Sequence, residues 1–204
     1  MNRIFALIFC FGFLSTNAQE TNKPEFDGHK WEAPYNLPVP RAYTVERFLI
    51  PISFAPSIKY KGVEDIRFTP GWANSKTHDY WTYAFLWWLD GNVEMDSVTL
   101  ANNLKAYYTG LAKANNVPAD KQLPVKTSFK EVKTGKGDLK TFTGTIEMVD
   151  YMTKEPLTLY AMVHLRRCNE ENKTVVFHKI SPKPFTHSNW ATLEELWMQF
   201  NCKK

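Results

Sequence analysis

The aromatic segment at residues 78–88 constrains the fold more than any other part of this chain. It reads His-Asp-Tyr-Trp-Thr-Tyr-Ala-Phe-Leu-Trp-Trp. Such a run predicts a long, almost wholly apolar strand over Asp79–Leu89, which ends at the turn Asp90-Gly91. Because side chains alternate between the two faces of a strand, one set of large side chains forms the predicted core face, namely Trp81, Tyr83, Phe85, Trp87 and Leu89.

The opposite face of this predicted strand carries Tyr80, Thr82, Ala84, Leu86 and Trp88. Small side chains in its middle leave space between two aromatic ends. One interpretation is that a helix over 96–114 packs into that space, since small positions on a sheet are where helices approach closely. The other is that an apolar or sugar-like ligand occupies it. Both interpretations remain open at the level of sequence.

The rest of the sequence predicts two earlier strands, one helix, a further group of strands and a terminal helix. Strands are predicted over Val45–Phe54 and Val63–Phe68, and the 96–114 helix has Asp96 as its N-cap. Further strands are expected around Phe129, around Phe142, Ile146 and Val149, over Leu157–Arg167 and over Thr174–Ile180, and a final helix carries Trp190, Leu193, Trp197 and Phe200. This order predicts an α+β fold, a twisted antiparallel sheet of about six or seven strands with two main helices packed on one side.

The first eighteen residues have the organisation of a signal peptide. A basic start at Met1-Asn2-Arg3 precedes the apolar run Ile4–Leu14, and small side chains flank a cleavage site before Gln19. The run is too short for a membrane-spanning helix, which needs about twenty apolar residues. We therefore expect cleavage of residues 1–18, an exported protein in the periplasm or extracellular space, and membrane contact only through the transient leader.

The mature chain divides into an arm and a domain. Prolines at this density predict an extended arm over residues 19–43, held down by Trp31 and Tyr35. Residues 44–204 are predicted to form a single domain. Loss of Arg3 with the leader lowers the formal net charge from +4 to +3, and charges of both signs alternate along the chain. This distribution lacks the basic patch of a nucleic-acid-binding protein, so nucleic acid is excluded as a partner.

The two cysteines of the mature chain predict one disulfide. Cys10 leaves with the leader, so Cys168 and Cys202 remain. An exported protein with two cysteines and no CxxC spacing most often joins them. Closure of the intervening loop stabilises the fold by roughly 3–4 kcal/mol in the loop-entropy account. The bond would tie the carboxyl terminus to a β-hairpin.

A second aromatic feature lies in a predicted loop. Trp72 follows Pro70-Gly71, where no periodicity explains its burial. Together with His78 and Tyr80 it could form a stacking platform for a sugar ring; the alternative is an aromatic side chain that closes one end of the core. These three residues, with Thr82 and Trp88 from the strand, are the candidate ligand-binding residues.

Two histidines are the candidate metal ligands. His164 and His178 lie on successive predicted strands and face each other only if the turn between them has five residues. Glu147 or a water molecule could then complete a site. A four-residue turn would place the two histidines on opposite faces. No cofactor is expected.

Catalytic motifs are absent from the sequence. It contains no GxSxG, no HExxH and no cysteine in a catalytic context. Paired carboxylates, as in glycosidases, come together only in space. Asp79, Asp90 and Glu94, near the aromatic strand, are the candidates for such a role, although solvation at the surface explains them equally well.

A distributed pattern gives one resemblance. It comprises Glu46-Arg47, Pro51 and Phe54-Ala55-Pro56, followed by Gly62-Val63-Glu64-Asp65-Ile66 and Pro70-Gly71-Trp72. This pattern resembles uncharacterised exported single-domain proteins of Gram-negative bacteria and covers most of the mature chain. The resemblance implies a periplasmic or surface location and no particular activity.

Three functional hypotheses follow from the sequence. The leading one is an exported non-catalytic domain that binds a glycan, an apolar ligand such as a lipid, or an envelope protein through residues 72–88. The second is a secreted hydrolase of a glycan or ester. The third is an assembly subunit whose proline-rich arm docks on a neighbour.

Overall fold

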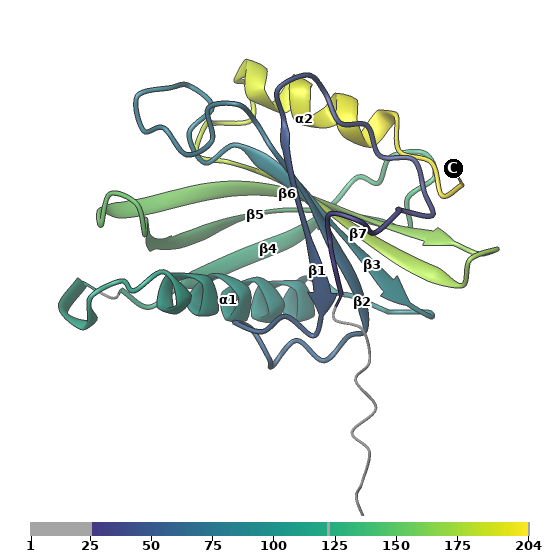
Figure 1. The fold of residues 1–204 in the computed structure, drawn as a ribbon, viewed down its shortest axis with the longest axis horizontal. Helices are drawn as coiled ribbons and strands as arrows, with labels where there is room; N and C mark the ends of the chain where they lie inside the picture. Colours follow the sequence, from purple (N-terminus) through teal and green to yellow (C-terminus); the bar gives the residue numbers. More distant parts are fainter. Residues whose placement is uncertain (1–25, 122, 204) are drawn as a thin grey trace, which may run out of the picture.

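The computed structural model describes residues 26–121 and 123–203, so the predicted signal peptide lies outside the described residues. Seven antiparallel strands form one open sheet (Figure 1). The strands in sheet order are β1 (Thr44–Ile50), β2 (Gly62–Phe68), β3 (Tyr83–Asp90), β7 (Lys173–Ser181), β6 (Pro156–Cys168), β5 (Lys140–Val149) and β4 (Lys126–Val132). The helices are α1 (Ser97–Ala114) and α2 (Ser188–Met198), with a short 3₁₀ turn at Ala119–Lys121. The predicted α+β class and antiparallel sheet are confirmed.

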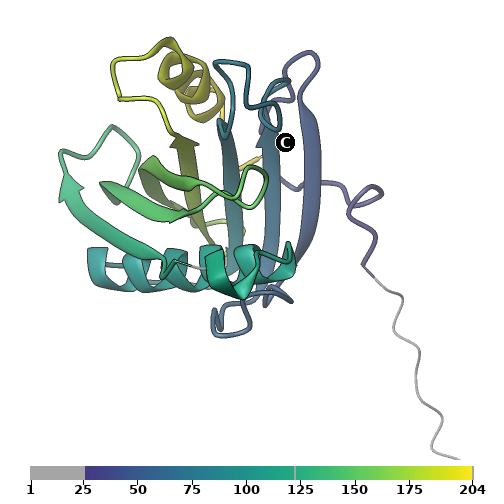
Figure 2. The ribbon, with the colours of Figure 1, turned by 90° about the vertical axis from the view of Figure 1, so that its left-hand side faces the viewer.

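The two helices lie on opposite faces of the sheet rather than on one side (Figures 1 and 2). The reason lies in β3, whose side chains are buried on both faces: Phe85 and Leu86 are each 0% exposed. A strand without a polar face requires a covering layer on each side. Phe85 belongs to the core beneath α1, and Leu86 belongs to the core beneath α2.

The sequence-based prediction that the 96–114 helix covers the Thr82–Ala84–Leu86 face is wrong. Instead of the 96–114 helix, the carboxyl-terminal helix α2 packs there, through Trp190, Leu193, Leu196 and Trp197. Helix α1 covers the Tyr83–Phe85–Trp87 face. It begins as predicted, because the Asp96 side chain accepts a hydrogen bond of 2.7 Å from the Thr99 amide.

The described part of the proline-rich arm packs on its own domain. The Tyr35 hydroxyl donates to Asp65 Oδ2 at 2.9 Å, and Arg67 donates to the carbonyls of Leu37 and Pro38 at 3.3 and 3.1 Å. Asn36 forms a β-bridge with Asn201. These bonds hold residues 35–38 against β2 on the α2 side of the sheet.

The predicted disulfide is confirmed. Cys168 at the end of β6 is bonded to Cys202, with their Cα atoms 5.5 Å apart. The carboxyl terminus is thereby fixed to the hairpin of β6 and β7. Within the described residues, neither helix combines the length and the apolar character needed to cross a bilayer.

Candidate functional site

A cleft of about 700 Å³ lies between α1 and the part of the sheet formed by β1, β2 and β3. Its floor consists of alternate residues from these strands, namely Thr44, Glu46 and Phe48, then Ile66 and Phe68, then Tyr83. The walls come from Phe54 in the β1–β2 connection, Trp72 and Trp81 between β2 and β3, Tyr107, Leu111 and Ala114 of α1 with its C-cap Asn115, and Tyr151 after β5. His29 of the arm and Val45 and Arg47 of β1 complete the lining. The volume is typical of a small-molecule site.

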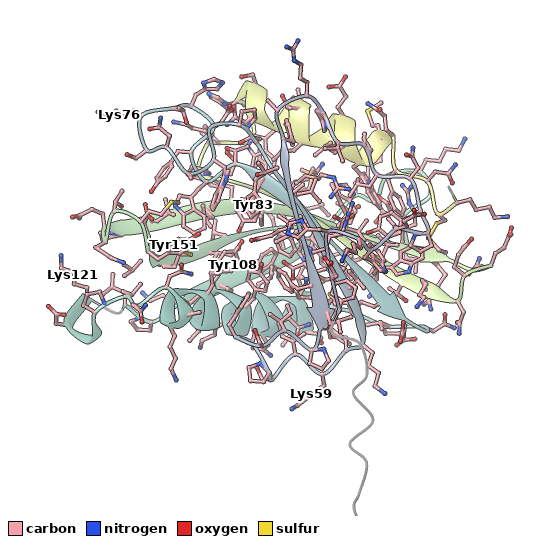
Figure 3. The ribbon with its side chains drawn as sticks, in the orientation of Figure 1. Lys59, Lys76, Tyr83, Tyr108, Lys121 and Tyr151 are labelled. Carbon is pink, nitrogen blue, oxygen red and sulfur yellow. A yellow bond between two sulfur atoms is a disulfide. The ribbon has the colours of Figure 1, made fainter. Side chains whose placement is uncertain are left out.

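Eight aromatic rings surround this space, which we call the aromatic cleft: Phe48, Phe54, Phe68, Trp72, Trp81, Tyr83, Tyr107 and Tyr151. Figure 3 labels Tyr83 and Tyr151, which lie with Tyr108 on the α1 side of the sheet. The Tyr83 and Tyr108 hydroxyls are 2.6 Å apart, so the floor is tied to the helix. Five of the eight rings are half-buried and so keep part of their surface open to solvent, namely Phe48, Phe54, Phe68, Trp72 and Tyr151.

Close approach of α1 to the β1–β2 connection depends on Gly110. A Cβ atom there would lie 1.9 Å from the backbone oxygen of Phe54. The absence of a side chain therefore lets Phe54 pack edge-on against Tyr107, with ring centroids 5.1 Å apart. This contact forms one wall of the cleft.

Trp72 forms part of the wall on the other side. Its ring stacks on Phe68 at a centroid distance of 4.2 Å, and its backbone oxygen accepts a hydrogen bond of 2.8 Å from the Trp81 amide. Trp81 has a φ of 54°, in the left-handed region that bulky residues rarely adopt. Such a conformation costs of order 1–3 kcal/mol and persists where packing enforces it. Here Trp81 packs edge-on against Tyr151 at 5.0 Å.

The aromatic strand begins later in the chain than the sequence predicts. The sequence predicts a strand from Asp79, whereas β3 begins at Tyr83. The Thr82 amide donates to the Asp79 carbonyl at 2.8 Å, which closes a turn over residues 79–82. The turn directs Trp81 into the cleft.

A buried carboxylic acid supports the α1 wall. Glu64 is 0% exposed and accepts hydrogen bonds from Trp87 Nε1 at 2.8 Å and from the Tyr107 hydroxyl at 2.7 Å. Desolvation raises the pKa of Glu64 to about 8, although both hydrogen bonds oppose the rise. Glu64 is therefore largely protonated at neutral pH.

A second buried carboxyl group, Asp150, lies beside the cleft and keeps its charge. It accepts hydrogen bonds from the hydroxyls of Tyr80 and Thr153 and from the Met152 amide. Burial alone would raise the pKa of Asp150, but the hydrogen bonds from Tyr80 and Thr153 outweigh it and the pKa is lowered. This anion adjoins Tyr151 of the cleft wall.

The five ligand-binding candidates from the sequence do not form one site. Trp72 lines the aromatic cleft. The Tyr80 hydroxyl instead donates a hydrogen bond to Asp150. His78 is exposed, and its Nε2 atom lies 3.3 Å from Oδ1 of Asp79. The platform of Trp72, His78 and Tyr80 is replaced by the stack of Trp72 on Phe68.

The other two candidates are enclosed on the α2 side. Thr82 is 0% exposed, and its hydroxyl is 2.9 Å from that of Ser181 and accepts a hydrogen bond of 2.8 Å from Nδ2 of the Asn189 side chain. Trp88 is 3% exposed and packs against Tyr35 of the arm at 4.7 Å. Side chains of the protein itself therefore fill the space that the sequence left open to a ligand.

The two candidate metal ligands are separated by the sheet. The turn between β6 and β7 has four residues, and the register pairs His164 with Phe177 and His178 with Val163. His164 therefore faces α2, where it is 2.9 Å from Asp138, and His178 faces α1, where it stacks on Phe85 at 4.0 Å. No metal site can use both.

The remaining metal candidate lies at the surface. Glu147 is exposed and lies 3.8 Å from Lys126 of the neighbouring strand. Across residues 26–121 and 123–203, no three His, Cys, Asp or Glu side chains are grouped so as to hold a metal ion.

The carboxylates considered for hydrolysis lie at different ends of β3. Asp79 precedes the strand, whereas Asp90 ends it and pairs with Lys173, and Glu94 lies beyond it, exposed. Residues 83–90 of an extended strand span on the order of 25 Å. Glycosidase carboxyl pairs lie within about 10 Å of each other, so Asp79 and Asp90 do not form such a pair.

Sequence reasoning missed most of the cleft. Phe48, Phe54, Tyr107 and Tyr151 come from four segments that no local motif connects. The signal available was the excess of aromatic residues outside the core stripe, which includes Phe54 in a proline-bounded loop. Comparison with protein-family models, curated proteins and solved structures found no match to this chain.

Proposed function

We propose that this protein is an exported, non-catalytic domain that binds a small ligand with an apolar body in the aromatic cleft. The observation that carries the proposal is a space of about 700 Å³ surrounded by eight aromatic rings, five of them half-buried. Partly exposed rings leave apolar surface in contact with water. Burial of about 100 Å² of that surface by a ligand would contribute about 2.5 kcal/mol to binding.

The position of the cleft supports this proposal over the enclosed α2 face. The stack of Trp72 on Phe68 offers a flat apolar surface that suits a ring or an alkyl chain. Rigid strands β1, β2 and β3 supply the floor, so the site is preformed. Export is proposed from the leader sequence at residues 1–18, and the disulfide of Cys168 and Cys202 supports an oxidising compartment.

Intrinsic tryptophan fluorescence and calorimetry test the proposal. Mature protein is titrated with a soluble aromatic alcohol, an alkyl glucoside, a short lipid and a cell-wall oligosaccharide. Trp72→Ala should weaken binding of the best ligand at least ten-fold, because it removes half of the exposed stack. Phe185→Ala is the matched control, since Phe185 is a loop aromatic outside the cleft and, at 40% exposed, is more accessible than the half-buried Trp72. Saturable binding that Trp72→Ala leaves unchanged would show that the cleft is not the site.

A further inference from the structure

The aromatic cleft carries a charge of one sign on its floor. Glu46, Arg47 and His29 are the Asp, Glu, Lys, Arg or His residues among the described residues that line it. Side chains of adjacent strand residues point to opposite faces. Glu46 pairs with Ile66 of the cleft floor, whereas Arg47 pairs with Asp65 on the α2 side and bonds it at 2.9 Å. The Arg47 guanidinium group is therefore held behind the sheet, where it shares Asp65 with Arg67.

The Glu46 carboxylate is left without a counter-ion. Within the described part of the chain it forms no ion pair within 4.0 Å and no side-chain hydrogen bond. It is exposed on the edge strand β1, where the floor meets the rim of the cleft. Its charge nevertheless reaches the cleft wall. The pKa of Tyr151 is raised to about 12 by burial, then by the Asp150 charge, then by that of Glu46. Both anions thus act on this ring.

The lysines near this end of the cleft are bound to other groups. Lys30 lines a neighbouring hollow with Glu46 but forms an ion pair with Asp27 at 3.0 Å. Lys154 donates its ammonium hydrogen to the Tyr151 backbone carbonyl and is not among the lining residues. The faces of aromatic rings are themselves electron-rich and attract cations. The Glu46 carboxylate and the faces of the aromatic rings therefore both favour a cation in the cleft.

We infer that the aromatic cleft selects an organic cation, an amine or quaternary ammonium group carried on an apolar body, with Glu46 as its counter-ion. This inference rests on the proposed function and names its ligand class. Aromatic rings that surround a methylated ammonium group are a recurrent means of recognising such ligands. The apolar body would contact the stack of Trp72 on Phe68, while the ammonium group would lie at the rim beside Glu46.

A pair of isosteric probes tests the inference. The cation is para-trimethylammonio benzyl alcohol, and the neutral probe is para-tert-butyl benzyl alcohol, which has the same shape and hydroxyl group. Calorimetry on the mature protein at low salt should show the cation binding about five-fold more tightly or better, the size expected of one carboxylate with cation–π contacts. Glu46→Gln should abolish this preference. Glu131→Gln, an exposed strand glutamate on β4 at the opposite edge of the sheet, should retain it.

The two possible failures are distinguishable. Equal affinity for both probes in the wild type, or a preference that survives Glu46→Gln, overturns the cation inference. If the neutral probe still binds and Trp72→Ala weakens it, the proposed function stands. If neither probe binds, both proposals fail together.

Discussion

Tyr107 donates a hydrogen bond of 2.7 Å to Glu64, so a residue of the cleft wall is anchored by a carboxylic acid buried beneath the helix. The Trp87 indole donates to the other carboxyl oxygen at 2.8 Å. Glu64 therefore links β2, β3 and α1 at the place where the cleft is formed. Its protonation makes the stability of this region depend on pH.

The first prediction concerns that dependence. Because burial raises the pKa of Glu64 from 4.5 to about 8, the native state holds a proton that the unfolded chain releases in this window. The unfolding free energy therefore falls as pH rises from 4.5 to 8, by about 1.4 kcal/mol per unit. Glu64→Gln lacks this loss. Urea unfolding at pH 5 and pH 8.5 should show the wild type losing up to about 4 kcal/mol relative to the variant. Parallel pH profiles would refute this account of Glu64.

The second prediction is that His178 makes the unfolding free energy fall as the pH is lowered, the opposite of the trend expected from Glu64. Burial lowers the pKa of His178 from 6.5 to about 3, so the native state stays neutral while the unfolded chain takes up a proton. The unfolding free energy is thus lost as pH falls from 6.5 towards 3. His178→Phe keeps a ring stacked on Phe85 but does not titrate. Between pH 7 and 4.5 the wild type should lose up to about 3 kcal/mol more than this variant. An equal loss in both proteins would exclude His178 as the cause.

The buried charge cluster beneath the arm supplies the third prediction. Asp65 is 0% exposed and accepts hydrogen bonds from Arg67, Arg47 and Tyr35. Asp65→Asn leaves the Arg67 guanidinium group buried without a counter-ion, which should lower the unfolding free energy by about 3–5 kcal/mol. Amide hydrogen exchange at residues 35–37 should accelerate as well.

A matched control for this prediction is Asp27→Asn. Asp27 forms an exposed ion pair with Lys30 at 3.0 Å, and its removal should leave the unfolding free energy unchanged within error. Exchange at residues 35–37 that is as slow in Asp65→Asn as in the wild type would show that the cluster does not hold the arm.

Gly110 gives the fourth prediction. Alanine in the middle of a helix is favoured over glycine by about 1 kcal/mol, but here the added Cβ would meet the Phe54 backbone oxygen at 1.9 Å. Gly110→Ala should therefore destabilise the fold by about 1–3 kcal/mol and weaken ligand binding by displacing Phe54. Gly135→Ala is the control, because its Cβ would meet no atom closer than 3.6 Å. A Gly110→Ala variant more stable than the wild type would contradict the close approach.

Local patterns in the sequence predict the elements of this fold well. Alternation in Leu157–Arg167 and the Asp96 cap identify β6 and the start of α1, because both signals depend on neighbouring residues. The side of the sheet on which each helix packs was not predictable in this way. It depends on β3 being buried on both faces, which requires the tertiary placement of α2 and the arm.

The candidate site was less predictable for the same physical reason. In the segment Gly62–Phe68, the charges of Glu64, Asp65 and Arg67 indicate exposure when read alone, yet all three side chains are buried through bonds to distant residues. The separation of His164 from His178 depended on one residue of turn length. Trp72 was identified because its loop position had no explanation in the core pattern.

The seven indole N–H signals of the protein provide the most direct test of the central claim, that the aromatic cleft binds a ligand. Nitrogen-15 spectra are recorded during titration with para-trimethylammonio benzyl alcohol, with assignments from single Trp→Phe variants. The account predicts saturable shifts at Trp72 and Trp81, which line the cleft, and none at Trp190 and Trp197, which belong to α2 on the other face of the sheet. Unmoved signals from Trp72 and Trp81, or equal shifts at Trp190 and Trp197, would contradict it.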